Sequence, residues 1–361
     1  MDLSLVPDGG LGWLHASGPQ SHLVLSTRIR LARNLADFRF GTRMGAPDRQ
    51  AILDRVVAAA AGTDALGSAA AFRIDELDDW DRRLLLERHL ISRELAGEDD
   101  RGRPRNARAL LLQDKAAVMV NEEDHLRLQV LGSGVDFGAN WGLVEAVDAE
   151  LGQRLAFAFH PQFGYLTSCP TNVGTGLRAS VLIHLPGLVL TKEINKTLHG
   201  LTKIGLTYRG LYGEGSEVVG NFFQLSNQTT LGKSEKELLD QLGAIVQHVI
   251  QVEERARQVL LRDAPAVLED KVWRAYGLLR YARALDFEET MNLLSGVRLG
   301  VSLKLLGDVG MYALNKLLVF TQPAHLVAEA GGLLSDDELA VRRADLVRRT
   351  LEDEVRRGQG L

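Results

Sequence analysis

SHLVLSTRIRLAR, residues 21–33, alternates apolar and polar side chains along its length. Leu25, Ile29 and Leu31 fall on one face, whereas Arg28 and Arg30 fall on the other. Period-two alternation is typical of a β-strand, because successive side chains point to opposite sides of a sheet. The stretch therefore predicts a strand that carries two arginines on one face.

The segments that follow predict a mixture of strands and helices. ALLLQDKAAVMVNEEDHLRLQVL (109–131) again has apolar residues at even spacing, and its other face carries Asn121, Glu123, His125 and Arg127. A glycine-rich loop ending in CPTNVGTG (169–176) precedes a predicted strand, RASVLIHL (178–185). We expect helices at 48–61, 78–91 and 141–153, and a charged loop at 97–106.

From about residue 234 the pattern becomes entirely helical. Ser234 followed by Glu237 is a capping-box signal, and Ala264-Pro265 marks a break. Beyond it, Val272, Tyr276 and Leu279 recur at helical spacing, typical either of core or of an interface. Further helices are predicted at 267–285, 287–295, 298–305, 308–321 and 335–357. We place a boundary near residue 255, which divides the chain into a mixed catalytic part, 1–255, and a helical part, 256–361.

Composition excludes several classes of protein. The 361 residues are 45% hydrophobic and 25% charged, as in a globular protein. No apolar run approaches the roughly 20 residues that span a bilayer, and the N-terminus lacks the pattern of a signal peptide. A net charge of −5 argues against nucleic acid as the main partner. The single cysteine, Cys169, excludes an intrachain disulfide and fits a reducing cytoplasm.

Five arginines lie at predicted strands, strand ends and loops: Arg28, Arg30, Arg127, Arg178 and Arg209. A guanidinium group binds phosphate oxygens in a fork and stays charged at physiological pH, so the five predict a polyanion site. Solvated surface positions are the alternative. The chain has neither a GxxxxGK[ST] loop nor a GxGxxG turn. The glycine-rich stretch TNVGTGLR (171–178) either brings backbone N–H groups close to a phosphate or forms a plain turn. If this protein binds ATP, arginine side chains therefore do most of the binding.

Acidic residues accompany these cations. In NEEDHLR (121–127), Glu123 and Arg127 share a predicted strand face about 13 Å apart, so Arg127 would hold a phosphate while Glu123 holds the acceptor. A polar hairpin edge is the alternative. Glu214, between two glycines, lies either on a mobile loop or in a simple turn.

Two further residues are candidates for the site. Cys169 is either a thiolate beside a cationic substrate or a small buried residue. His89 is predicted to lie on the face of a helix.

Four of these stretches together resemble the phosphagen (guanidino) kinase family: STRIRLARNL, NEEDHLRLQ, CPTNVGTGLRASV and RGLYGEGSE, in family order. The similarity extends from about residue 21 to 351 and is closest to the bacterial protein-arginine kinases of that family. The resemblance implies an α+β fold. Its catalytic domain would be an antiparallel sheet flanked by helices, of the glutamine-synthetase-like type, followed by an all-helical C-terminal domain that dimerises and regulates.

The resemblance also implies a site. Glu123 and Glu214 would grip the acceptor guanidinium, with Cys169 beside it, and a mobile Glu214 loop would close over the acceptor. Mg²⁺ would arrive with ATP rather than bind to a dedicated protein site. The implied ATP contacts are Ser26, Thr27, Arg28, Ile29, Arg30, His89, Arg127, Arg178, Ala179, Ser180, Val181, Leu182, Arg209, Gly210, Leu211, Tyr212, Gly213 and Glu214.

By the same resemblance, we expect a kinase that phosphorylates arginine side chains of proteins, marks them for Clp-type proteolysis and regulates a stress-response repressor. A zinc-finger activator protein and a homodimer are also implied. A kinase of a free guanidino metabolite is the alternative; it would carry a helical domain before the first arginine box. An inactive phosphoarginine-binding adaptor is a third possibility, which the intact catalytic positions disfavour.

One stretch departs from the family pattern. Where the family has an RDxxRA motif that binds phosphoarginine, this chain has LAVRRA (339–344), with Leu339 and Ala340 in place of the Arg-Asp pair. We therefore predict that this allosteric pocket is weakened or lost. The remaining arginines of the helix would then lie on a solvated face: Arg342, Arg343, Arg348 and Arg349.

Overall fold

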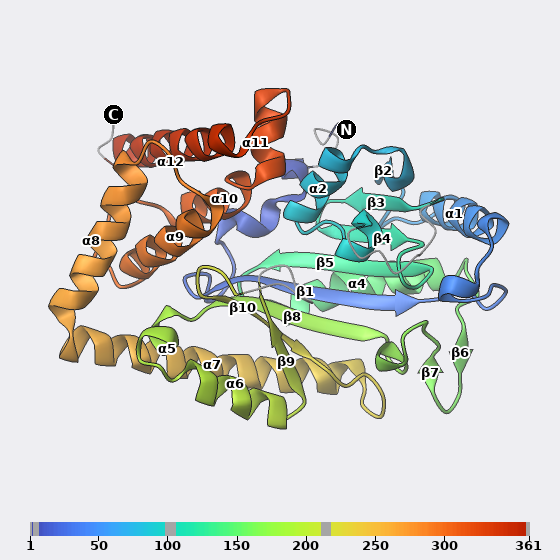
Figure 1. The fold of residues 1–361 in the computed structure, drawn as a ribbon. Coiled ribbons are helices and arrows are strands. Elements are labelled where there is room, and N and C mark those ends of the chain that lie inside the picture. The colour runs from blue at the N-terminus through green and yellow to red at the C-terminus, as the bar shows by residue number, and fades with distance from the viewer. Residues whose placement is uncertain (1, 3–6, 98–105, 211–217, 359–361) are drawn as a thin grey trace. The chain divides into compact units, whose positions relative to one another are not determined.

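The computed structural model describes residues 2, 7–97, 106–210 and 218–358 (Figure 1). An eight-stranded sheet has the order β2-β3-β4-β5-β1-β8-β10-β9. Its strands are β1 (Val24–Arg33), β2 (Ala70–Arg73), β3 (Ala109–Gln113), β4 (Ala116–Val120), β5 (Leu126–Ser133), β8 (Leu177–His184), β9 (Leu206–Arg209) and β10 (Phe222–Asn227). A separate two-stranded sheet pairs β6 (Phe159–His160) with β7 (Gly164–Tyr165).

The chain divides into two compact units. The first unit comprises Met1–Trp13, Thr27–Ser180 and Ser226–Gly243, and the second comprises Leu14–Ser26, Val181–Leu225 and Ala244–Leu361. The long helix α7 (Glu235–Asp263) contributes to both. The predicted division at residue 255 stays a prediction.

The first unit is built on antiparallel hairpins. Strands β2, β3, β4 and β5 pair in sequence order, and Val120 lies opposite Leu126 across the β4–β5 hairpin. Helix α4 packs against β5 and helix α1 against β4. An apolar core that includes Leu85, Leu95 and Leu110 joins the strands to two shorter helices. The helices are α1 (Ala46–Ala61), α2 (Asp79–Glu87), α3 (Arg93–Ala96) and α4 (Phe137–Gly152).

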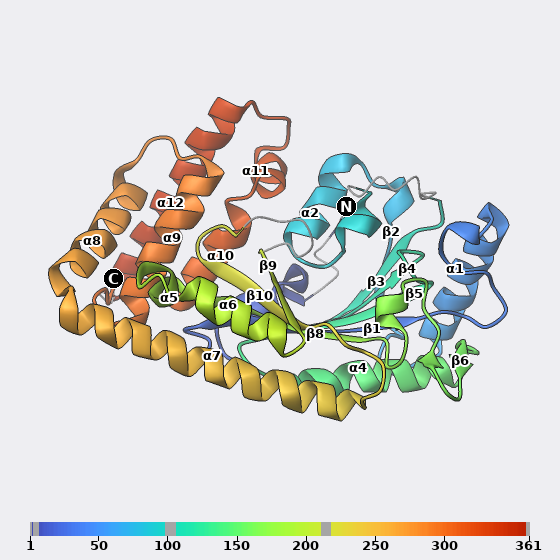
Figure 2. The same ribbon diagram turned by 60° about the horizontal axis from the view of Figure 1, so that its bottom comes forward.

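The second unit is mostly helical. Helix α8 packs against α9 and α12, and α10 packs against α9 (Figure 2). Val272, Tyr276 and Leu279 of α8 are buried within the chain, so they belong to its core. The helices are α5 (Pro186–Leu190), α6 (Ile194–Lys203), α8 (Pro265–Tyr281), α9 (Phe287–Ser302), α10 (Met311–Phe320), α11 (Pro323–Ala330) and α12 (Asp336–Gly358).

These elements confirm the predicted α+β class, an antiparallel sheet with helices followed by a helical C-terminal region. The capping box at the start of α7 is also present. The backbone N–H of Ser234 donates to the Glu237 carboxylate at 2.8 Å, and the N–H of Glu237 donates to the Ser234 hydroxyl at 3.3 Å. Among the described residues, no helix is both long and apolar enough to cross a membrane.

Two helices predicted at 287–295 and 298–305 are a single helix, α9. Two glycines of this helix, Gly296 and Gly300, lie where α9 meets α8. A Cβ atom at Gly296 would approach the Ala275 Cβ to 2.9 Å, and one at Gly300 would approach Val272 Cγ1 to 2.3 Å. The glycines therefore permit close helix packing rather than end the helix.

Two further predictions are wrong near the site. The alternation through 109–131 predicted strand at residues 121–125, but these residues form the turn of the β4–β5 hairpin, closed by a bond from Asn121 N to His125 O at 2.9 Å. His89 is not helical, because α2 ends at Glu87 and His89 has a φ of +59°. Residues 98–105 of the predicted charged loop lie outside the described part.

Candidate active site

Four of the five predicted arginines gather in the first unit. Arg28 and Arg30 lie on β1, Arg127 on β5 and Arg178 on β8, and β1 is the middle of these three neighbouring strands. Burial, and then the charges of Arg28, Arg127 and Arg178, hold the pKa of Arg30 well below its usual value. The buried Nε of Arg30 has no hydrogen-bond partner among the described residues. Such a concentration of like charge favours a polyanionic ligand.

The residues between these arginines support the strands. Thr27 donates its hydroxyl to Gly134 O at 2.6 Å, and Asn227 Oδ1 accepts from the backbone N–H of Ala179 at 2.8 Å. The predicted contact residues that are buried in β1 and β8 are Ser26, Thr27, Ile29, Ala179, Ser180, Val181 and Leu182. These seven residues are uncharged and buried, so the charged groups that the two strands contribute to the site are the arginines.

Arg127 connects the cations to the acids of the hairpin turn. Its Nη1 lies 2.6 Å from Glu122 Oε1, and its Nη2 lies 3.7 Å from Glu123 Oε2. Burial alone would lower the pKa of Arg127, but the carboxylates of Glu122, Glu94 and Glu123 raise it. The expected separation of about 13 Å does not apply, because Glu123 lies in the turn and its side chain approaches Arg127 directly.

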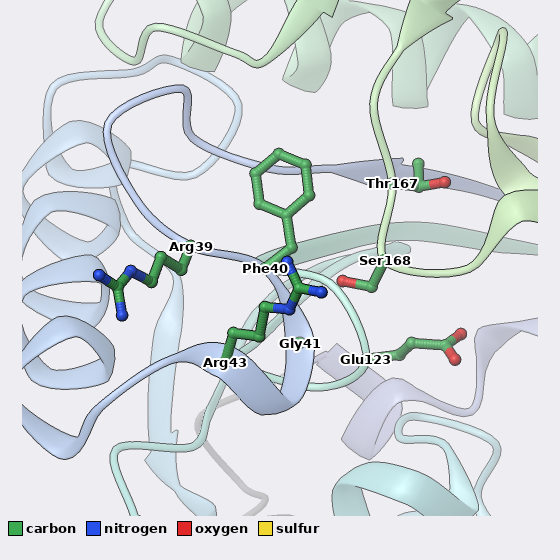
Figure 3. A pocket seen from close by; sticks show the side chains of 7 residues that line it. All are labelled: Arg39, Phe40, Gly41, Arg43, Glu123, Thr167 and Ser168. Atoms are coloured by element: carbon green, nitrogen blue, oxygen red, sulfur yellow. The ribbon is translucent and has the colours of Figure 1, made fainter.

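Glu122 and Glu123 have different environments although they are adjacent. Glu122 is buried, accepts the Ser92 hydroxyl at 2.5 Å and the backbone N–H of Glu123 at 2.6 Å, and its pKa is raised by burial. The side chain of Glu123 is 20% exposed and lines a cavity of about 830 Å³ (Figure 3). Glu122 therefore holds Arg127 in place, while Glu123 faces solvent and any entering ligand.

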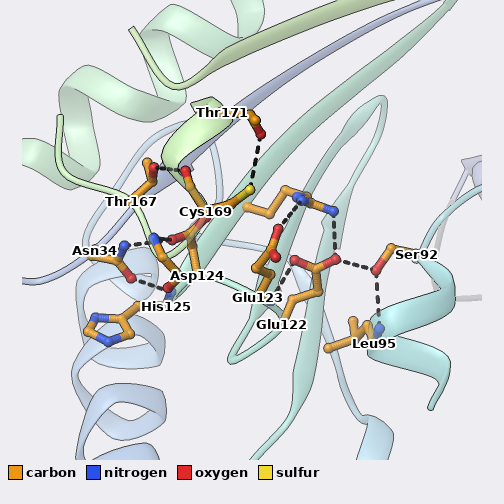
Figure 4. Close-up of polar contacts among 12 residues, drawn as sticks. Asn34, Ser92, Leu95, Glu122, Glu123, Asp124, His125, Thr167, Cys169 and Thr171 are labelled. Carbon is orange, nitrogen blue, oxygen red and sulfur yellow. Dashed lines mark hydrogen bonds and ion pairs between the residues drawn. The ribbon is translucent and has the colours of Figure 1, made fainter. Parts of the chain in front are cut away.

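Asp124 fastens the turn to the segment that carries Cys169. Its Oδ1 accepts hydrogen bonds from Asn34 Nδ2 and from the backbone N–H of Ser168, both at 2.6 Å. Cys169 is partly exposed, and its Sγ lies 3.0 Å from Thr171 Oγ1 (Figure 4). The Asp124–Ser168 bond thus brings the residue next to Glu123 and the residue next to Cys169 into contact.

His89 lies in the same unit and stays neutral. Burial, and then the charge of Arg28, lower its pKa to about 3. Its ring meets the Trp13 ring edge-to-face at 5.4 Å, and Gln129 Nε2 donates to its carbonyl at 2.9 Å. His89 follows the end of α2 with a left-handed backbone, which a helix-face position would not predict.

The remaining predicted contacts are not among the described residues of the first unit. Arg209 ends β9 in the second unit and Gly210 follows it. Leu211, Tyr212, Gly213 and Glu214 lie outside the described residues. On α12, Arg343 is not on a solvated face: it is buried and donates to Thr321 O at 2.7 Å and Leu285 O at 2.8 Å. Loss of the phosphoarginine pocket stays a prediction.

Sequence reasoning missed Glu122, Asp124, Ser92 and Asn34. The sequence did contain a signal for the two acids. Glu122 and Asp124 occupy even-numbered positions, like the apolar residues on either side of the turn, which are buried. Ser92 and Asn34 gave none, because their roles depend on contacts with distant segments. Among the described residues, no group of three or more His, Cys, Asp or Glu side chains is placed to hold a metal ion.

Comparison with known proteins identifies the family. The profile of the ATP:guanido phosphotransferase C-terminal catalytic domain matches residues 51–256, and that of the protein-arginine kinase McsB C-terminal domain matches residues 265–359. The chain is 47% identical to a protein-arginine kinase of Symbiobacterium thermophilum over 94% of its length and 96% of the relative's. It is 44% identical to one of Geobacillus stearothermophilus over 96% of its length and 94% of the relative's.

Solved structures agree with this assignment. A duplicated taurocyamine kinase from Schistosoma mansoni, in complex with transition-state analogue components, superposes with a TM-score of 0.59 at 27% identity, over 70% of this chain and 35% of that one. A lombricine kinase gives a TM-score of 0.57 at 25% identity, over 67% of this chain and 70% of that one. The chain therefore belongs to the ATP:guanido phosphotransferase family, in its protein-arginine kinase branch.

Proposed function

We propose that this protein-arginine kinase holds the phosphates of ATP with Arg28, Arg30, Arg127 and Arg178, and aligns the acceptor guanidinium with Glu123. The observation that carries the proposal is Arg127, which belongs to the arginine cluster and also lies 3.7 Å from Glu123. One side chain thus joins a site suited to phosphate with a carboxylate suited to a guanidinium.

The arginine cluster fits a triphosphate on physical grounds. Burial, and then the charges of the three neighbouring arginines, lower the pKa of Arg30, and a polyanion offsets the repulsion among these four cations. The buried Nε of Arg30 gains an acceptor when a phosphate oxygen approaches it. Phosphoryl transfer depends mainly on positioning and on neutralised oxygens, which fixed guanidinium groups supply.

Glu123 would act on the acceptor. A guanidinium group is a poor nucleophile because its lone pairs are delocalised, so it must be aligned and must lose a proton. Glu123 binds its N–H groups and directs one Nη toward the γ-phosphorus. The N–P bond forms, the bond from the γ-phosphorus to the ADP oxygen breaks, and the Nη proton passes to a carboxylate.

The other predicted contacts complete the proposal. His89 contacts the nucleotide as a neutral ring, Cys169 lies beside the acceptor, and Arg209 adds a fifth cation to the phosphates. Glu214 would be the second carboxylate that binds the acceptor guanidinium. The phosphates of ATP, rather than a dedicated protein site, would hold Mg²⁺, which would help to neutralise their charge.

The cellular role follows the resemblance. We propose a cytoplasmic homodimer that phosphorylates exposed arginines of proteins and marks them for a Clp-type protease. A stress-response repressor would be a substrate, and a zinc-finger protein would be an activator. These partners are supported by the family resemblance alone.

Glu123→Gln tests the carboxylate's role. The substitution keeps the shape of the side chain and removes its charge, while Arg127 retains Glu122 at 2.6 Å, so we expect a folded protein. The rate of casein phosphorylation, measured by mass spectrometry with ATP, should fall about 100-fold or more, the scale of lost proton-transfer catalysis. Glu145→Gln, on the exposed surface of α4, is the matched control. A Glu123→Gln enzyme as active as this control contradicts the mechanism.

A further inference from the structure

The cavity beside Glu123 carries two cations that phosphate binding does not use. Its lining residues are Arg39, Phe40, Gly41, Arg43, Glu123, Thr167 and Ser168. Arg39 and Arg43 are exposed, and no ion pair involves either of them among the described residues. Two acids close to them in sequence are engaged elsewhere, since Asp37 lies 3.3 Å from Arg55 and Asp48 accepts the backbone N–H of Gly45. In Figure 3, Arg43 extends toward Ser168, across the cavity from its own loop.

The loop that carries these cations is fixed to the catalytic turn. His125, two residues after Glu123, accepts the backbone N–H of Leu35 through Nδ1 at 2.9 Å. Its Nε2 therefore carries the ring proton and donates to the carbonyl of Arg39 at 3.0 Å. Its ring also meets Phe38 and Phe40 edge-to-face. Burial lowers the pKa of His125, which keeps this neutral arrangement in place.

The far end of the loop is also held. Arg49 is buried on α1 and donates to the carbonyl of Met44 at 2.8 Å. Gly41 adopts a φ of +57°, a left-handed conformation that glycine adopts without strain. The cations of the loop are therefore carried on a backbone with a defined position relative to Glu123, not on a loose surface segment.

The charges of this cavity do not match an arginine alone. The acceptor is itself a cation, and like charges repel more strongly near a protein surface than in bulk water. Arg39 and Arg43 therefore oppose the entry of a bare arginine beside Glu123. A substrate that brings a carboxylate as well would offset this repulsion.

We propose that Arg39 and Arg43 select substrates by binding an Asp or Glu side chain within two residues of the acceptor arginine. Neighbouring residues of an extended polypeptide are about 3.3 Å apart, which allows one to reach Glu123 while the other reaches the loop. The inference rests on the proposed role of Glu123 as the acceptor site. It assigns to this chain a preference for acidic sequences around the arginine.

Synthetic peptides with one arginine test the preference. One set carries Asp or Glu at positions −2 to +2 around the arginine, and a matched set carries Asn or Gln at the same positions. For the wild-type enzyme we expect kcat/KM to be about 2- to 5-fold higher for the best acidic peptide than for its amide counterpart, the scale of an exposed ion pair.

Variants assign that preference to the loop. In the double variant Arg39→Gln/Arg43→Gln, the ratio between acidic and amide peptides should fall to about one, whereas Arg262→Gln, an exposed arginine on α7, should keep the wild-type ratio. Arg43→Glu should prefer lysine-flanked peptides. A wild-type ratio of one, or a double variant that keeps the wild-type ratio, overturns the proposal.

Two further arms separate the possible sources of failure. Glu123→Gln should lose activity on acidic and amide peptides alike, so its result judges the catalytic proposal independently of any preference. Free arginine and argininamide differ only in the α-carboxylate. Consider a double variant that loses the preference between free arginine and argininamide and still keeps the wild-type ratio between acidic and amide peptides. In that case Arg39 and Arg43 bind the α-carboxylate of a free amino acid, and the inference is wrong.

Discussion

His89 shows how the arginine cluster sets the charge of a single neighbouring residue. Burial and the charge of Arg28 both disfavour its imidazolium form, so its pKa in the folded protein is about 3, against about 6.5 in an unfolded chain. Below pH 6.5 the unfolded chain therefore binds more protons than the native chain does. His89 therefore contributes a fall in the free energy of unfolding as the pH decreases from 6.5 toward 3.

Replacing His89 should reduce this acid sensitivity. Glutamine does not titrate, so His89→Gln should make the fall in unfolding free energy shallower by at most about 1.4 kcal/mol per pH unit. Urea unfolding at pH 7, 6 and 5 measures the slope for wild type and variant, and the slope rather than the absolute stability is the readout. Parallel slopes for the two proteins would mean that His89 titrates normally.

Identical residue types at adjacent positions have different roles here, which limits prediction from sequence at this scale. NEEDH predicted Glu123 on the same strand face as Arg127, about 13 Å from it. In the structure the two side chains lie 3.7 Å apart, because Glu123 is in the hairpin turn. The pattern did not reveal that Glu122 makes the 2.6 Å contact, because that role depends on burial and on Ser92, thirty positions earlier in the chain. Local periodicity carries no information about such long-range partners.

Elements form where local signals and packing agree. The alternation of residues 21–33 predicted β1, and the Ser234–Glu237 box predicted the start of α7. The same local reading failed at α9, which was predicted as two helices, 287–295 and 298–305. In the structure the missing Cβ atoms of Gly296 and Gly300 leave room for α8, so a tertiary contact decides the role of these glycines.

A pair of glycine substitutions with opposite effects tests that packing. Gly300→Ala would place its Cβ 2.3 Å from Val272 Cγ1 and should lower stability by about 1–3 kcal/mol, as overpacking does. Gly277→Ala on α8 meets nothing within 4 Å and should raise stability by about 0.5–1 kcal/mol through helix propensity. Thermal or urea unfolding measures both. If Gly300→Ala also stabilises, the close contact between α8 and α9 is wrong.

At the scale of the whole molecule, the sequence predicted the class of fold and the family because several motifs occur together in order. Each motif alone allowed a simple structural explanation, such as a hairpin edge or a turn. The match of four motifs and the 47% identity to a protein-arginine kinase remove that ambiguity. Four elements, β1, β8, β10 and α7, each contribute residues to both compact units, and the predicted division at residue 255 stays a prediction.

The central claim is that one cluster of guanidinium groups holds the phosphates of the nucleotide next to Glu123. A crystal structure of the enzyme with bound ADP and Mg²⁺ tests it most directly. We predict phosphate oxygens within about 3 Å of guanidinium nitrogens of Arg28, Arg30, Arg127 and Arg178, the distance of a hydrogen bond. A nucleotide whose phosphates lie against other residues, with these four arginines unliganded, would contradict the account.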